Sequence, residues 1–175
     1  MGSIANAIVP AGNLSLRYAE MLLKDIRPAD FARFPAPGGK PVHTNNPAFV
    51  YGHLAMYPQR VLEMLGQPKG LTATPADWDG LFKAGVECKD DPNGTSYPTM
   101  EKLVAFHRAA YEAALAAVSS ASDAQLSAPN PGEGRMKEMF PTVGAVCNFI
   151  VAAHPMSHYG QVSAWRRCMG LGSAM

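Results

Sequence analysis

The sequence of 175 residues has no excess of charge of either sign and few cysteines. Its 15 Lys and Arg residues nearly balance 14 Asp and Glu residues, so it lacks the basic surplus with which proteins neutralise nucleic-acid phosphates. We therefore expect no nucleic-acid partner. Cys88, Cys147 and Cys168 are an odd number without CxxC spacing, which favours a reducing compartment over a disulfide framework.

Long apolar runs and targeting signals are also missing. No stretch reaches the roughly 18 consecutive apolar residues of a membrane span, and the N-terminal segment has neither a basic leader nor an apolar run long enough for a signal sequence. Asn6 occupies the position at which a myristoylation signal needs Ser or Thr. These absences predict a cytoplasmic protein with no membrane partner.

The alternation of apolar and polar residues that is typical of β-strands is absent as well. Instead, four segments repeat apolar residues every three or four positions, separated by stretches rich in Pro, Gly and Asp. We predict one all-α domain over residues 1–175, an antiparallel four-helix bundle with long connecting loops at residues 27–45 and 66–97. Trp78, Leu81 and Phe82 suggest a short helix within the second loop.

Caps and prolines set the expected limits of these helices, which are about residues 10–26, 47–65, 98–118 and 141–169. Asn46 is expected to cap the second helix ahead of Pro47, and Gly66 to end it. In the first helix, the spacing predicts an inward stripe formed by Leu14, Tyr18, Met21, Leu22 and Ile26.

Two histidines stand in the apolar stripe of the fourth segment. At about 100° per residue, His154 and His158 share one sector with Cys147, Ile150 and Val162. Residues four apart on a helix have Cβ atoms about 5–6 Å apart, so both rings can bind one ion. A lone buried His is usually a hydrogen-bonded core residue, but two on one apolar stripe have few local donors. A shared metal ion satisfies both acceptor nitrogens.

Pro155 follows the first of these histidines and removes one backbone hydrogen bond. Because the apolar residues before and after it stay in phase, we predict a kinked but continuous helix, with the carbonyl of Val151 released. Gln161, on the same face, could orient a ring or a bound water, or could simply be solvated. Gly160 is expected to allow close helix packing.

A metal site needs at least one more ligand. His53 and His107 both lie at the apolar sectors of their own segments, so spacing leaves the choice between them open. A core His107 bonded to a Tyr or a backbone carbonyl is equally compatible with the pattern. His43 lies in a Pro-flanked loop and is expected to be solvated.

Most of the chain resembles the DinB superfamily, the metal-dependent four-helix bundles that include the mycothiol- and bacillithiol-dependent transferases. The resemblance is carried by NNPAFVYGHLAMYPQRVLEMLG, by the connector with DWDGLF and SYP, by TMEKLVAFHRAAYEAALAAV and by HPMSHYGQVSAWRRCMGL. It implies that His53, His154 and His158 are the three metal ligands. Pro155 departs from the family pattern, as does Tyr159, which stands where Arg is common and alters the expected contact with substrate.

Three neutral imidazoles leave a divalent ion with its full charge and an open position, as in catalytic zinc sites. Zinc or nickel suits such ligands best, ahead of magnesium or calcium. We expect a metal-dependent enzyme, a thiol transferase, isomerase or hydrolase, that activates a thiol or water against a small-molecule electrophile, with a low-molecular-weight thiol as candidate cofactor. Candidates for ligand support or substrate contact are His107, Gln161 and Tyr159.

The alternative is a non-catalytic stress-response or interaction module that holds a structural ion or none. No Ser-His-Asp or Gly-rich phosphate motif competes with the metal hypothesis, and the sequence nominates no general base. An apolar helical protein of this kind is also compatible with a homodimer.

Overall fold

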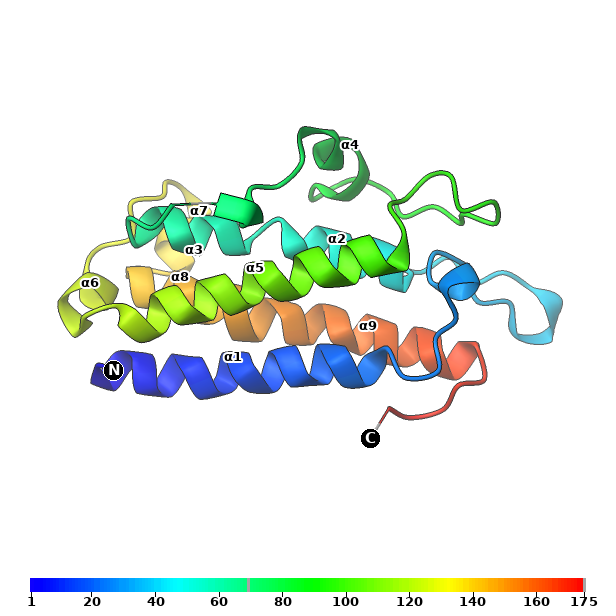
Figure 1. The fold of residues 1–175 in the computed structure, drawn as a ribbon, viewed down its shortest axis with the longest axis horizontal. Coiled ribbons are helices and arrows are strands. Elements are labelled where there is room, and N and C mark those ends of the chain that lie inside the picture. Colours follow the sequence, from blue (N-terminus) through cyan, green and yellow to red (C-terminus); the bar gives the residue numbers. More distant parts are fainter. Residues whose placement is uncertain (69, 175) are drawn as a thin grey trace.

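The computed structural model describes residues 1–68 and 70–174, and these form helices and loops without a β-strand (Figure 1). The all-α class is therefore confirmed. Most of the body is built from α1 (Ser3–Leu22), α2 (Pro47–Ala55), α3 (Pro58–Met64), α5 (Met100–Ser120), α8 (Val143–Asn148) and α9 (His154–Cys168). Shorter helices occupy the connections, namely α4 (Asp79–Phe82), α6 (Asp123–Ser127) and α7 (Arg135–Met139).

The long helices lie side by side along the longest axis of the molecule (Figure 1). α1 and the α8–α9 segment run in one direction, whereas α2, α3 and α5 run in the other, so consecutive helices do not all alternate in direction. The connector between α3 and α5 makes this possible, because it carries the chain back along the molecule before α5 begins. α4 lies within that connector, near Trp78 as the sequence suggested, and packs against α2.

The first helix differs from its prediction at both ends. It begins at Ser3 because Asp123, far away in sequence, accepts hydrogen bonds from the backbone N–H groups of Ser3 (3.0 Å) and Ile4 (2.9 Å). Pro10 lies inside the helix rather than at its start. At the other end, Arg166 of α9 donates to the carbonyls of Leu22 (2.8 Å) and Lys24, so the helix ends at Leu22.

The predicted stripe of α1 was wrong for two of its residues. Leu14 is 64% exposed and Met21 is 41% exposed, whereas Leu22 is buried as expected. Small side chains let α1 approach its neighbours closely, and a Cβ at Gly12 would stand 3.0 Å from Cγ2 of Val151. The buried face consists of Ala5, Ile8, Gly12, Ser15, Ala19 and Leu22.

The second predicted helix is divided by Pro58. Asn46 caps α2 as expected, since its Oδ1 accepts from the N–H of Phe49 at 3.0 Å, and Gly66 adopts a left-handed φ of 68° after α3. Pro58 has no N–H to continue the hydrogen-bond ladder of α2, so the chain starts α3 at this residue. The interruption leaves Tyr57 at the junction of the two helices.

The fourth segment stays helical through Pro155, as predicted. α8 begins after Thr142, whose side chain accepts from the N–H of Ala145 at 3.2 Å, and continues as a π-helix over residues 149–153. The N–H of His154 reaches back five residues to the carbonyl of Phe149. This wide turn accommodates a proline, and α9 then runs from His154.

Two buried apolar clusters fill the interior, one around Tyr51, Trp78 and Trp165 and the other around Val61 and Val146. Along the fourth segment, the chain leaves the second cluster at Ala152 and enters the first at Tyr159. The two histidines of α9 therefore lie between the last residue that belongs to the second cluster and the first residue that belongs to the first cluster.

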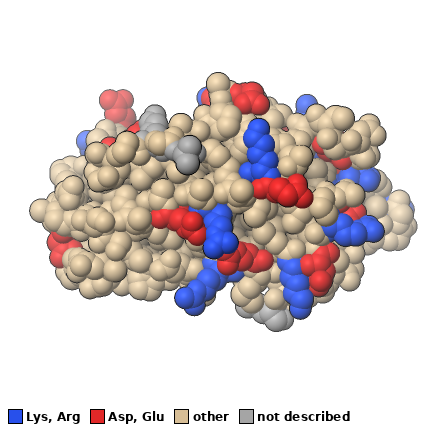
Figure 2. Space-filling model, in the orientation of Figure 1, with Lys and Arg blue, Asp and Glu red and all other residues tan. Residues whose placement is uncertain are grey.

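On the face carrying α1 and α5, basic and acidic side chains alternate instead of forming a patch of one sign (Figure 2). Arg108 illustrates this, since it contacts Glu20 at 3.3 Å and Glu112 at 2.8 Å. Within the described residues, no helix has the length and apolar character needed to cross a bilayer.

Candidate metal centre

His53, His154 and His158 come together between α2 and α9. Each offers one ring nitrogen, and these three atoms all lie within 4.8 Å of one another. The ring centroid of His53 lies 5.5 Å from that of His154 and 4.8 Å from that of His158. The centroids of His154 and His158 are 4.8 Å apart. His53 is buried, whereas the other two are half-buried.

His53 is held by a backbone carbonyl. Its Nδ1 lies 2.7 Å from the oxygen of Phe82, and because a carbonyl only accepts, Nδ1 must carry the proton. The lone pair is then on Nε2, which is the ligand form of the ring. Gly52 allows Phe82 to come this close, because a side chain at residue 52 would clash with it. Three atoms of the Phe82 ring lie within 2.5 Å of where a Cβ of residue 52 would stand.

His158 and His154 face each other through their Nε2 atoms, which are 3.1 Å apart. On its other side, His158 places Nδ1 3.2 Å from Oε1 of Gln161, and the same oxygen accepts from Nδ2 of Asn45 at 3.0 Å. The position of Gln161 is thus compatible with the predicted role of orienting a histidine ring, here that of His158. Nδ1 of His154 is buried and has no hydrogen-bond partner within the described residues.

Aromatic rings surround these imidazoles. Phe149 stacks on His154 with centroids 5.1 Å apart, and the edge of Tyr57 meets both His154 (4.6 Å) and His53 (5.0 Å). Burial, followed by repulsion from His158 and His53, lowers the pKa of His154 to about 4. Burial also lowers the pKa of His53 and His158. All three rings are therefore neutral near pH 7, as metal ligation requires.

The donor set fits a small divalent ion. Two nitrogens bound at about 2.0–2.1 Å to one tetrahedral ion lie about 3.4 Å apart. The facing Nε2 atoms of His154 and His158 are already close to that separation, at 3.1 Å. The remaining distances are no longer than 4.8 Å, so modest ring rotations would bring all three donors to one centre.

His107 and Tyr159 lie elsewhere. The hydroxyl of Tyr159 is 2.9 Å from Nε2 of His107, whose ring stacks on Tyr111 at 4.6 Å, and both residues are buried. Burial lowers the pKa of His107 to about 3. Of the two alternatives for His107, the structure thus places it as a core His bonded to a Tyr. His43 is exposed in its loop, as expected.

Sequence reasoning missed three residues around the histidines. Asn45 was not singled out, because its neighbour Asn46 was the residue expected to cap the helix. Phe82 contributes a backbone oxygen, which cannot be predicted from the type of its side chain. Tyr57 was not assigned to the site because an aromatic side chain in an apolar helical stripe is more typical of the core than of a metal site.

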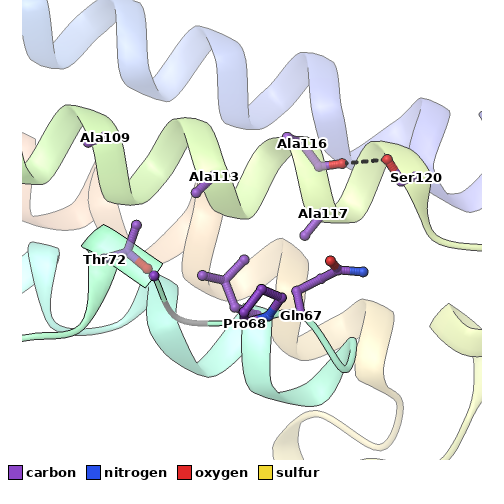
Figure 3. A pocket seen from close by; sticks show the side chains of 10 residues that line it. Gln67, Pro68, Thr72, Ala109, Ala113, Ala116, Ala117 and Ser120 are labelled. Carbon is purple, nitrogen blue, oxygen red and sulfur yellow. Dashed lines mark hydrogen bonds between the residues drawn. The ribbon is translucent and has the colours of Figure 1, made fainter.

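A cavity of about 530 Å³ lies apart from this centre, between α5 and the segment that follows α3 (Figure 3). Ala109, Ala113 and Ala117 form its α5 wall, and Pro68 and Thr72 face them. Its described lining residues carry no titratable side chain, so it offers space without the chemistry of the histidine cluster.

The DinB superfamily profile matches residues 14–162, a range that contains all three histidines, and the chain belongs to this superfamily. No curated protein and no solved structure matches the chain.

Proposed function

We propose that this member of the DinB superfamily binds a divalent transition metal through His53, His154 and His158 and uses it to activate a thiol or water. The observation that carries the proposal is the convergence of three neutral imidazole nitrogens within 4.8 Å from two separate helices. Such ligands suit zinc or nickel. When bound, the ion would supply an open coordination position that acidifies a thiol or water.

The protein's own residues supply the rest of the site. Phe82 and Gln161 hold acceptor oxygens against Nδ1 of His53 and His158, which turns Nε2 of each ring inward. Phe149 and Tyr57 exclude water from the sides of the rings. The half-exposed His154 and His158 form the accessible edge, from which a small electrophilic substrate would approach.

We take α1, α2–α3, α5 and the α8–α9 segment as the four members of a helical bundle, with the metal between the second and fourth members. In this arrangement His53 and the pair His154 and His158 would hold the ion between two helices that are distant in sequence. Metal binding should therefore contribute to folding as well as to chemistry.

Elemental analysis of the purified protein, followed by titration of the metal-free form with zinc, nickel and cobalt, tests the ligand assignment. His154→Ala should lose both bound metal and turnover in a panel of thiols and small electrophiles. His43→Ala is the matched control, because His43 is exposed and outside the cluster. A His154→Ala protein that retains one equivalent of metal would remove the basis of the proposal.

A second function, a non-catalytic module with a structural ion, is favoured by the burial of His53 and by its aromatic surroundings. The two functions separate in one experiment. If metal removal lowers the melting temperature while no thiol and electrophile pair shows metal-dependent turnover, the structural function holds.

A further inference from the structure

Two hydrogen bonds converge on a single oxygen atom next to the proposed metal centre. Oε1 of Gln161 lies 3.0 Å from Nδ2 of Asn45 and 3.2 Å from Nδ1 of His158. Gln161 is one turn beyond His158 on α9, whereas Asn45 belongs to the loop that precedes α2. The loop thus reaches across to a residue that touches a histidine.

The direction of these bonds determines which nitrogen of His158 carries the proton. Asn45 presents Nδ2 to Gln161, and because an amide NH₂ only donates, the atom that it meets is the oxygen of Gln161. That same oxygen then faces Nδ1 of His158, which must donate to it. The lone pair of His158 is left on Nε2, the atom that points at His154.

The opposite arrangement would disable the ligand. If the amide of Gln161 were reversed, its NH₂ would face His158, whose Nδ1 would have to accept. Nε2 would then be protonated and unable to bind an ion. A side-chain amide can reverse, whereas the backbone carbonyl that holds His53 cannot. His158 therefore depends on a partner that fixes Gln161.

Asn45 is well placed to be that partner because its neighbour is immobilised. The side chain of Asn46 is fully buried and donates to the carbonyls of Ala32 (2.8 Å) and Lys89 (2.9 Å). Its Oδ1 caps α2, and its backbone N–H donates to Sγ of Cys88 at 3.4 Å. These bonds hold the backbone from which the side chain of Asn45 extends.

We infer that Asn45 is a positioning residue that acts through Gln161 to keep His158 in the tautomer with its proton on Nδ1. The inference rests on the proposed function for its purpose, since that tautomer matters only if Nε2 of His158 binds a metal. The tautomer itself is a property of the metal-free protein, so it can be measured separately.

The test combines two measurements on metal-free protein that has first been shown to be folded by circular dichroism. Long-range ¹H–¹⁵N correlation spectra report which imidazole nitrogen of His158 is protonated, and titration with cobalt reports affinity. Asn45→Asp replaces the donor with an acceptor of the same shape, and Gln161→Leu removes the oxygen. Gln161→Glu keeps an acceptor for both partners. Asn148→Ala, an exposed residue of α8, is the control.

We expect the Nδ1–H tautomer of His158 in the wild-type, Gln161→Glu and control proteins, and a shift toward Nε2–H in Asn45→Asp and Gln161→Leu. Cobalt affinity should fall about tenfold to a hundredfold in the latter two and stay near the wild-type value in Gln161→Glu. If Asn45→Asp leaves the tautomer unchanged, or if the wild type already has Nε2–H, the inference is overturned even if the protein binds cobalt. If the tautomer responds but the wild type binds no metal, the proposed function fails and the positioning role stands.

Discussion

Replacing Gly52 with alanine should destabilise the protein despite the higher helix propensity of alanine. Gly52 lies inside α2, where exchange of Gly for Ala normally gains about 0.5–1 kcal/mol. Here, however, three atoms of the Phe82 ring lie within 2.5 Å of the new Cβ. Carbon atoms pack at about 3.5–4.0 Å, so the ring would have to move by about 1 Å or more.

The Phe82 ring has little room for such a movement. It is fully buried and packed against Trp78 (5.3 Å between centroids) and Tyr97 (5.7 Å). Overpacking of this kind costs about 1–3 kcal/mol or more, and the upper end applies where the neighbours cannot yield. After subtracting the gain in propensity, we expect a net loss of about 2 kcal/mol. For a protein of this size, that lowers the melting temperature by roughly 4–8 °C.

Gly160→Ala is the matched control, because Gly160 is also helical but nothing lies within 4 Å of a Cβ at that position. The predicted close packing at Gly160 was therefore wrong, and this variant should gain about 0.5–1 kcal/mol. Urea unfolding of both variants beside the wild type measures the difference. Cobalt affinity should also fall in Gly52→Ala, since Phe82 carries the carbonyl that holds His53. A Gly52→Ala protein as stable as Gly160→Ala would refute the reasoning about both packing and anchoring.

Three further predictions concern stability. Leu14→Ala should change the free energy of unfolding by less than about 0.5 kcal/mol, whereas Leu22→Ala should lower it by about 2–5 kcal/mol; equal effects in urea unfolding would contradict the observed face of α1. Arg166→Ala should lower the free energy of unfolding by about 2 kcal/mol or more, and with it the melting temperature, because the carbonyls of Leu22 and Lys24 lose their donor. An unchanged melting temperature in calorimetry would argue against this link between α1 and α9. The third prediction concerns pH, since the pKa of His107 is lowered to about 3 in the folded protein, below the value of about 6.5 in an unfolded chain. The unfolded chain then binds the extra proton, so the free energy of unfolding should fall by up to about 1.4 kcal/mol per unit as pH drops from about 6.5 toward 3. His107→Gln should flatten that slope, and an unchanged slope would exclude His107 as its source.

Local sequence was sufficient to predict features that depend on near neighbours in the chain. Asn46 ahead of Pro47 predicted a cap, and Gly66 a stop, because both act within one turn of helix. The pairing of His154 with His158 belongs to the same class. Residues four apart share a helix face whatever the helix packs against, and the helical phase persisted across Pro155.

Contacts between distant segments were decided only by the tertiary structure. Periodicity gave no preference between His53 and His107 as the third ligand, and the resemblance to the DinB superfamily favoured His53. In space, α2 brings His53 to α9 at the level of His154, whereas His107 meets Tyr159 instead. Asn45 reaches Gln161 across the molecule in the same way. The inward face of α1 also followed from packing, because small residues that carry little hydrophobic signal allow close approach to neighbouring helices. A helical period depends on bonds four residues apart, but the neighbour that a side chain meets depends on how whole helices pack.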